Sequence, residues 1–186
     1  MLKSIKNPQE LMQFLDNNIQ YGVIDKTGNK LFDSNSDKFQ QACFEDWTLR
    51  SPEQIISNQV GHCYDQVEIE RAWFKLNNYE FKTFWISAYQ PTIDNSGFSH
   101  TYLVYKQGSK WYLFEHADYS NKGIFEFLEL NDAVKWQANN QIKYATGVIK
   151  PKFAYEVCIK EYDTPPLNIN MQQYLQYIEQ SKDYNI

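Results

Sequence analysis

Three runs of aromatic and β-branched residues, at 81–89, 98–106 and 110–116, most constrain what this chain can fold into. Only residues 107–109, with a central glycine, separate the last two runs, a spacing that predicts a β-hairpin. A polar segment over 90–97 is predicted to be the loop between the first two. Because the residues before these runs show helical periodicity, helices are expected first and mostly antiparallel strands after them. That order is typical of an α+β fold rather than an alternating βαβ fold.

The helices of the first half are marked by their start signals. Asn7-Pro8 and Ser51-Pro52 each place a capping residue before a proline, and Ser36 lies at the start of another helical pattern. The central helix is predicted over 62–77. Its apolar face is formed by residues at helical spacing: Ile69, Ala72, Trp73 and Leu76.

Beyond the hairpin, the sequence predicts a helix over 125–138, strands over 143–150 and 152–162, and a last helix over 170–182. We find no internal repeat, low-complexity tract or linker in the sequence. The whole chain, residues 1–186, is therefore predicted to form one domain.

Composition and charge exclude several classes of protein. The 186 residues are 42% hydrophobic, enough for one core. A net charge of −5 without a basic stripe argues against nucleic acid as a partner. No run of 18 apolar residues is present, so no membrane partner is expected, and the N-terminus lacks the apolar core of a signal peptide. Three widely spaced cysteines argue against a disulfide framework and predict a cytoplasmic, reducing setting.

Cys63 is the candidate nucleophile. It follows Gly61-His62 at the first turn of the predicted central helix, where the helix dipole and free N–H groups favour a thiolate. A thiolate is the reactive form of cysteine, so this position suits covalent catalysis. The alternative is a buried, inert thiol. Cys43, within a helical apolar pattern, and Cys158, alternating inside a strand, are both predicted to be core residues.

Two acids follow Cys63 on the predicted helix, Asp65 and Glu68. A carboxylate beside a thiol disfavours the thiolate and would oppose the effect of the helix end. Helical geometry allows both acids to point away from Cys63, and they are predicted to be solvated or capping groups.

His100 is the candidate base. A two-residue turn at Gln107-Gly108 would pair hairpin residues whose numbers sum to 215, which places His100 opposite Glu115. Opposed Cβ atoms lie about 4.5–5.5 Å apart, so this carboxylate could hold the imidazole in one tautomer. Asp118, just after the strand, is the alternative orienter. A turn one residue longer would instead place His116 opposite His100.

A zinc site is the competing interpretation of the same side chains. Cys63, His100, His116 and an acid are all possible ligands. The chain offers neither a Cys-x-x-Cys pair nor two histidines at close zinc spacing, so no metal or other cofactor is predicted.

The ordered residues resemble the transglutaminase-like cysteine hydrolase superfamily, a branch of the papain-like fold, including small uncharacterised bacterial and phage members. The similarity covers about 51–118. It rests on a Gly-x-Cys motif before a helix, a strand, a histidine-bearing strand, a glycine turn, a tryptophan and an acid: Gly61-His62-Cys63-Tyr64-Asp65, 81–89, His100-Thr101-Tyr102, Gly108, Trp111 and Glu115. The interval from His100 to the acid is also the usual one. The family usually has aspartate where this chain has Glu115.

The resemblance implies a papain-like arrangement, in which N-terminal helices and a cysteine-bearing helix pack on an antiparallel sheet. It further implies acyl transfer on peptide or amide bonds through a thioester, with water or an amine as acceptor and a peptide or protein as substrate. Cys63 would be the nucleophile, His100 the base and then the acid, and Glu115 the orienter. The Cys63 N–H and an upstream amide, Gln59 or Asn58, would form the oxyanion hole.

A catalytically inactive binding module that keeps this fold is the alternative function. Two features motivate it: glutamate in place of aspartate at position 115, and an aromatic content of 17% that could serve a binding cleft.

Overall fold

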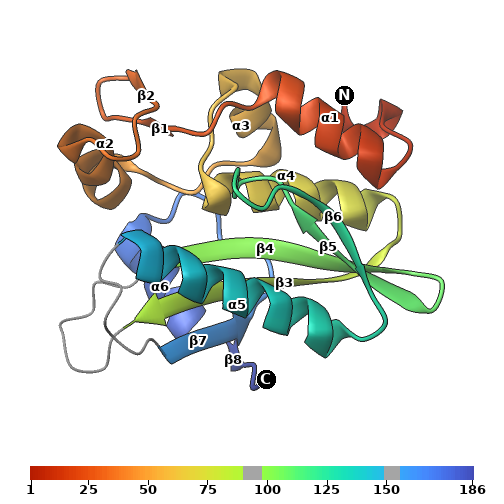
Figure 1. Cartoon of the computed structure of the whole chain (residues 1–186). Helices are drawn as coiled ribbons and strands as arrows, with labels where there is room; N and C mark the ends of the chain where they lie inside the picture. Colours follow the sequence, from red (N-terminus) through yellow and green to blue (C-terminus); the bar gives the residue numbers. More distant parts are fainter. Residues whose placement is uncertain (90–97, 149–155) are drawn as a thin grey trace.

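The sheet at the centre of the chain is antiparallel and six-stranded, in the order β6-β5-β4-β3-β7-β8 (Figure 1). The computed structural model describes residues 1–89, 98–148 and 156–186. Together with the helices, this sheet confirms the predicted α+β class. The strands have these bounds: β3 Glu80–Tyr89, β4 Phe98–Gln107, β5 Lys110–Glu115, β6 Gly123–Phe127, β7 Glu156–Glu161 and β8 Lys182–Asp183.

The first 76 residues are mainly helical, as predicted. They form η1 Leu2–Ser4, α1 Pro8–Asn18, β1 Val23–Ile24, β2 Lys30–Leu31, α2 Asp37–Gln41, the π-helix η2 Ala42–Asp46, α3 Pro52–Asn58 and α4 Cys63–Leu76. Side chains of Asn7, Ser36 and Ser51 cap α1, α2 and α3, so the start signals in the sequence are confirmed.

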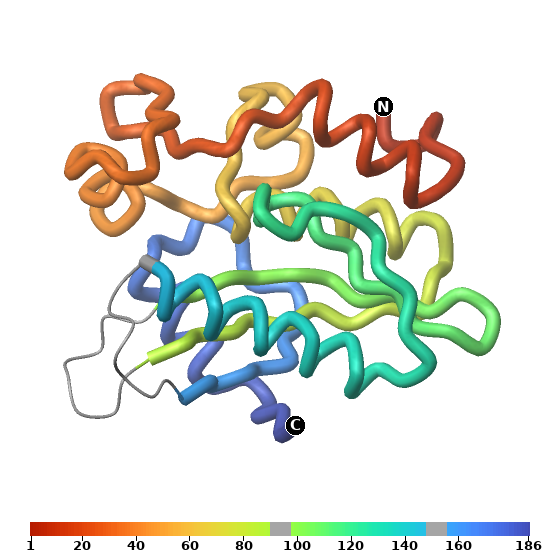
Figure 2. The backbone as a smooth tube through the Cα atoms, viewed as in Figure 1, coloured from red at the N-terminus to blue at the C-terminus, as the bar shows by residue number. Residues whose placement is uncertain are grey.

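The two faces of the sheet carry different helices. Leu103 and Tyr105 of β4 belong to a core formed with α1, α3 and α4, whereas Tyr102 and Val104 pack with α5, Leu130–Val148. This alternation is the two-residue period of a strand buried on both sides. Figures 1 and 2 show α5 crossing one side of the sheet, and the N-terminal helices gathered near α4.

A third cluster surrounds the N-terminal end of α4. It contains Cys63 and Tyr64 of that helix together with side chains from the α2–η2 region and from α6, Met171–Glu179. Tyr64 stacks on Tyr174 of α6 with ring centroids 4.6 Å apart. The start of the cysteine-bearing helix is therefore enclosed by segments from both ends of the chain.

The region after the hairpin corrects the prediction. The predicted helix over 125–138 is β6 in its first part, because every residue of Gly123–Phe127 pairs with β5. The predicted strand over 143–150 is helical as far as Val148, because it continues α5, where buried residues recur at helical spacing: Val134, Ala138, Gln141 and Ala145. The end of that predicted strand, the predicted loop over 90–97 and the start of the strand predicted over 152–162 lie outside the described residues.

The hairpin forms, but its register differs from the predicted one. Gln107 pairs with Lys110 and Leu103 with Phe114, so paired numbers sum to 217 rather than 215. Gly108 takes the positive φ of 63° that the first position of this tight turn requires, which leaves Gln107 in the strand. Because the two pair sums differ by an even number, every side chain of the hairpin still lies on its predicted face of the sheet.

Candidate active site

Cys63 is the first residue of α4, and the helix begins there because His62 caps it. The His62 Nδ1 atom accepts from the Tyr64 amide at 3.2 Å, and the Asp65 carboxylate accepts from the His62 amide at 3.3 Å. This reciprocal pair is a capping box with histidine in the usual serine or threonine position. Burial lowers the pKa of His62, so the ring is neutral and can accept this bond.

Asp65 ties the beginning of α4 to the preceding segment. Its Oδ2 atom accepts from Trp47 Nε1 and from Arg50 Nη2, each at 3.1 Å, and the residue is fully buried. Its predicted capping role is confirmed, but it is not solvated. The Arg50 charge and the indole N–H compensate for its burial. Glu68 is also buried rather than solvated, with Arg71 Nε 3.3 Å from its carboxylate.

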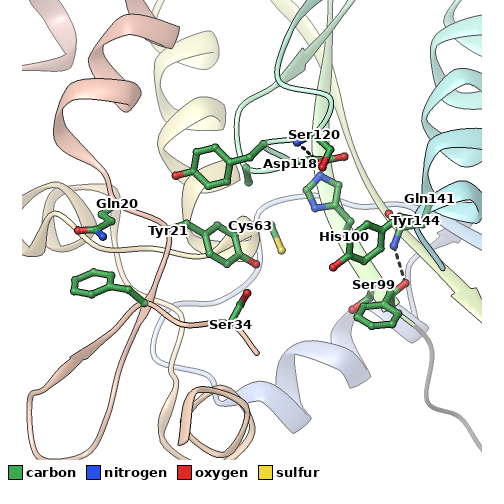
Figure 3. A pocket seen from close by; sticks show the side chains of 14 residues that line it. Gln20, Tyr21, Ser34, Cys63, Ser99, His100, Asp118, Ser120, Gln141 and Tyr144 are labelled. Atoms are coloured by element: carbon green, nitrogen blue, oxygen red, sulfur yellow. Dashed lines mark hydrogen bonds between the residues drawn. The ribbon is translucent and has the colours of Figure 1, made fainter. Parts of the chain in front are cut away.

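Cys63, His100 and Glu115 come together at one end of the sheet. His100 Nε2 lies 2.7 Å from Glu115 Oε2, and Glu115 is only 1% exposed. Because a carboxylate accepts, Nε2 carries the proton of this bond, which leaves Nδ1 for another partner. Figure 3 shows the Cys63 sulfur near the His100 ring. The arrangement places an imidazole between a thiol and a buried carboxylate.

The electrostatic surroundings of His100 favour its charged form. Burial lowers its pKa, but the Glu115 carboxylate and the Cys63 thiol both raise it, and the resulting pKa lies well above the usual histidine value. An imidazole held protonated beside a sulfur stabilises a thiolate there.

Glu115 is itself held by two further contacts. Its Oε1 atom accepts from the Asp118 amide at 2.9 Å, and its Oε2 atom accepts from Gln137 Nε2 of α5 at 3.3 Å. The Asp118 carboxylate accepts instead from the Ser120 amide and the Asn121 side chain. Asp118 therefore reaches Glu115 through its backbone, and its carboxylate is not hydrogen-bonded to His100.

The potential zinc ligands are not gathered into one site. Both ring nitrogens of His116 are hydrogen-bonded, Nδ1 to Gln66 at 2.5 Å and Nε2 to Asp16 at 3.1 Å. Among residues 1–89, 98–148 and 156–186, no three His, Cys, Asp or Glu side chains are grouped to hold a metal ion. His116 instead links α4 to the end of α1, since Gln66 belongs to α4 and Asp16 to α1.

The upstream amides do not reach the sulfur. Gln59 is an exposed C-cap residue of α3 with φ of 58°, and neither Gln59 nor Asn58 lines the pockets that contain Cys63. A role for one of them in the oxyanion hole stays a prediction, without support from the lining of these pockets.

Tyr21 takes the place near the sulfur instead, and sequence reasoning missed it. Figure 3 shows its hydroxyl beside Cys63. Burial raises the pKa of Tyr21, and the nearby Cys63 and Cys43 thiols raise it further, so the hydroxyl keeps its proton and can donate. Tyr21 lies in the connection between α1 and β1, where no local pattern indicates a functional residue.

Glu70 is a second buried carboxyl group near the site. Burial raises its pKa well above the usual value, and the Glu115 carboxylate raises it further, whereas His100 acts in the opposite direction. Two neighbouring carboxyl groups in an interior do not both ionise readily. Glu115 has His100 as its partner, so Glu70 is the group that holds a proton. No local pattern indicates this role, because Glu70 looks like an ordinary polar helix residue in the sequence.

Two adjoining pockets meet at Cys63, with volumes of about 470 and about 1470 Å³. His100 lines the smaller pocket and His62 the larger one. The residues that line both are Tyr21, Ser34, Cys63, Phe98, Ser99 and Tyr144. The sulfur therefore lies where the two parts of one groove join, within reach of a ligand that extends in both directions.

Comparison with known proteins gives no match, neither to a family model nor to a curated protein. Across the described ranges, no helix is long and apolar enough to cross a membrane. What the site can do chemically therefore follows from its own geometry. A thiol at a helix start, an imidazole with a raised pKa and a buried carboxylate are the parts needed for nucleophilic attack with acid–base assistance.

Proposed function

We propose that this protein is a cysteine-dependent acyltransferase that acts on peptide or amide bonds, with Cys63 as nucleophile, His100 as base and acid, and Glu115 as orienter. One observation carries the proposal. The His100 ring lies beside the Cys63 sulfur (Figure 3), and its Nε2 atom is 2.7 Å from the buried Glu115 carboxylate.

The reaction divides between these groups in two steps. The Cys63 thiolate attacks the amide carbonyl, and the new C–S bond forms a tetrahedral intermediate. Protonated His100 then gives its proton to the leaving nitrogen, the C–N bond breaks and a thioester remains. In the second step, neutral His100 takes a proton from water or an amine, which attacks the thioester and releases Cys63. Glu115 keeps the ring oriented and stabilises its charge throughout.

Two groups are placed to stabilise the oxyanion. The Cys63 N–H belongs to the first turn of α4, where amides lack partners within the helix. The Tyr21 hydroxyl, next to the sulfur, is the second donor. Donors aimed at developing charge in a site that excludes water contribute strongly to catalysis.

Replacing Tyr21 by phenylalanine tests that second donor. We expect kcat to fall about 10- to 100-fold with little change in KM, because the lost bond is made mainly in the transition state. Tyr119→Phe is the matched control, since Tyr119 lines the smaller pocket and its ring lies 6.3 Å from that of Tyr21. Equal losses in the two variants, or a change in KM alone, would remove Tyr21 from the oxyanion hole.

The layout of the chain supports a papain-like, transglutaminase-like assignment. A helix with cysteine at its N-terminus packs against an antiparallel sheet, and the next strands carry the histidine and the acid. Glutamate at position 115 departs from the family's aspartate, but its longer side chain reaches the imidazole. This contact weakens the argument that glutamate in place of aspartate at position 115 indicates an inactive binding module.

Selective alkylation is the direct test. At near-neutral pH we expect iodoacetamide to modify Cys63 before Cys43 and Cys158, read by mass spectrometry of tryptic peptides. Burial raises the pKa of Cys43 to about 12 and also raises that of Cys158. Solvent exposure alone predicts that Cys158 reacts before Cys63, because Cys158 is half-buried and Cys63 is buried.

The denatured protein supplies the control, in which all three cysteines should react at similar rates. Labelling of Cys158 first in the folded protein, or no labelling of Cys63, would contradict an activated thiol. An unreactive Cys63 together with retained cellular function in a Cys63→Ala variant would favour the inactive binding module.

A further inference from the structure

The exposed aromatic side chains of this protein are concentrated at the groove. Among the described residues, four aromatic side chains are classed as exposed, and each of them lines one of the two pockets: Phe32, Phe44, Tyr119 and Tyr144. Phe44 is 64% exposed although its side chain is apolar. Contiguous exposed apolar groups beside a cavity mark a binding surface.

The walls of the larger pocket continue this apolar character. Buried and half-buried rings line it, including Phe39, Trp85 and Phe98, with Leu175 of α6 among them. A pocket of this kind binds a ligand mainly through apolar and aromatic contact.

Charged groups are few in the groove, although the chain carries a net charge of −5. Apart from Cys63 and His100 of the site itself, the charged side chains among the described lining residues are Asp118 in the smaller pocket and Lys160 and Glu179 in the larger one. Asp118 is hydrogen-bonded to Ser120 and Asn121, and Lys160 lies 2.7 Å from Asp183. Both groups already have partners, so the described part of the lining offers a charged side chain little compensation for leaving water.

We infer that the groove binds an extended polypeptide segment whose side chain beside the reactive amide is bulky, apolar and uncharged, and that this side chain occupies the larger pocket. The inference rests on the proposed function, because it takes Cys63 as the point at which the amide lies. Pockets on both sides of the sulfur fit a chain that continues past the reacting bond. The aromatic rim contacts the flanking residues of that chain.

Peptide binding to a Cys63→Ala variant tests this inference without requiring catalysis. The probes are fluorescein-labelled peptides of alanine, serine and glycine that differ at one central position, which is Phe, Leu, Glu or Lys. We expect fluorescence anisotropy to give a Kd for the Phe and Leu peptides at least about tenfold lower than for the Glu and Lys peptides, or about 1.4 kcal/mol.

Rim variants made in the same Cys63→Ala background localise the binding. Phe44→Ser and Tyr144→Ser should raise the Kd of the Phe peptide about fivefold or more, whereas Leu128→Ser should leave it within twofold. Leu128 is the matched control, because it is 70% exposed and lines neither pocket. Circular dichroism of each variant checks that the fold is retained.

The outcomes separate this inference from the proposed function. Tighter binding of the Glu or Lys peptide, no binding of any peptide, or rim variants that behave like Leu128→Ser would each overturn the inference. If the Phe peptide binds as expected but the wild-type protein never cleaves or transfers it, the groove assignment stands and the acyl-transfer proposal fails. If the wild-type protein processes charged peptides best, the acyl-transfer proposal stands and the groove assignment fails.

Discussion

Replacing Cys63 by alanine is expected to abolish acyl transfer, with a loss of at least about 10⁴-fold in kcat/KM. The sulfur forms the covalent bond of the proposed thioester, and the methyl group of alanine cannot replace it. The variant should still fold, because removing one buried sulfur at the edge of a pocket leaves the capping contacts of His62 and Asp65 intact. The measurement is release of a fluorophore from a peptide amide, with and without an added primary amine.

Cys43→Ala is the matched control for this variant. Cys43 is buried in the same cluster and lines the larger pocket, but it does not line the pocket that contains His100. Its loss should change activity by less than about threefold, in line with a residue that does not react. Activity in Cys63→Ala comparable to that of the wild type would refute the thiol mechanism. The amine arm shows whether the thioester passes to water or to an amine.

Glu115→Gln is expected to lower kcat by about 10²- to 10⁴-fold and to move the alkaline limb of the pH profile to lower pH. Glutamine has nearly the same size, but it removes the charge and replaces one of the two accepting oxygens by an NH2 group. In the wild type, burial lowers the pKa of His100, whereas Glu115 and Cys63 raise it, with a net increase. Protonated His100 is therefore retained at pH values above the usual histidine range. Without the carboxylate, the proton is lost earlier as pH rises.

The raised pKa of His100 also makes the stability of the folded protein depend on pH. Because the folded-state pKa of His100 is raised, its stabilising contribution is complete below the unfolded histidine value of about 6.5 and disappears as pH rises through the folded-state value. Denaturant unfolding at several pH values should show that Glu115→Gln loses this contribution at lower pH than the wild type.

Glu126→Gln is the control for Glu115→Gln. Glu126 lies on the neighbouring strand β6 and pairs with Lys110, and both side chains are exposed to solvent. Its replacement should leave the pH profile unchanged, because exposed ion pairs contribute little. An unchanged alkaline limb in Glu115→Gln would exclude Glu115 as the residue that orients and charges His100.

The hairpin shows why a site can be predicted with imperfect geometry. The register predicted from the turn is wrong by two residues, yet His100 and Glu115 still meet, at 2.7 Å between Nε2 and Oε2. An even error preserves the face of every side chain, and the length of a glutamate side chain spans the diagonal separation that results. An odd error would have separated the two residues.

Contacts between distant segments were beyond sequence reasoning. Tyr21 reaches Cys63, and Gln137 reaches Glu115, only because the sheet and its helices bring separate parts of the chain together. A single tyrosine after α1 or a glutamine within α5 has no local pattern that indicates such a role. The same is true of the Arg50–Asp65 ion pair, because the sequence shows only two charged residues and not their contact. Helix caps and strand alternation, by contrast, depend on near neighbours and could be predicted.

The depth of the His100–Glu115 pair has a consequence for the ionic conditions in which the protein operates. Mobile counterions screen charges that face water, over a Debye length of about 8 Å at physiological ionic strength, but they do not enter a dry interior. Surface pairs such as Lys110–Glu126 weaken as salt is added, whereas a pair whose carboxylate is only 1% exposed is screened much less. The acid–base balance of the candidate site should therefore depend less on salinity than the surface pairs do.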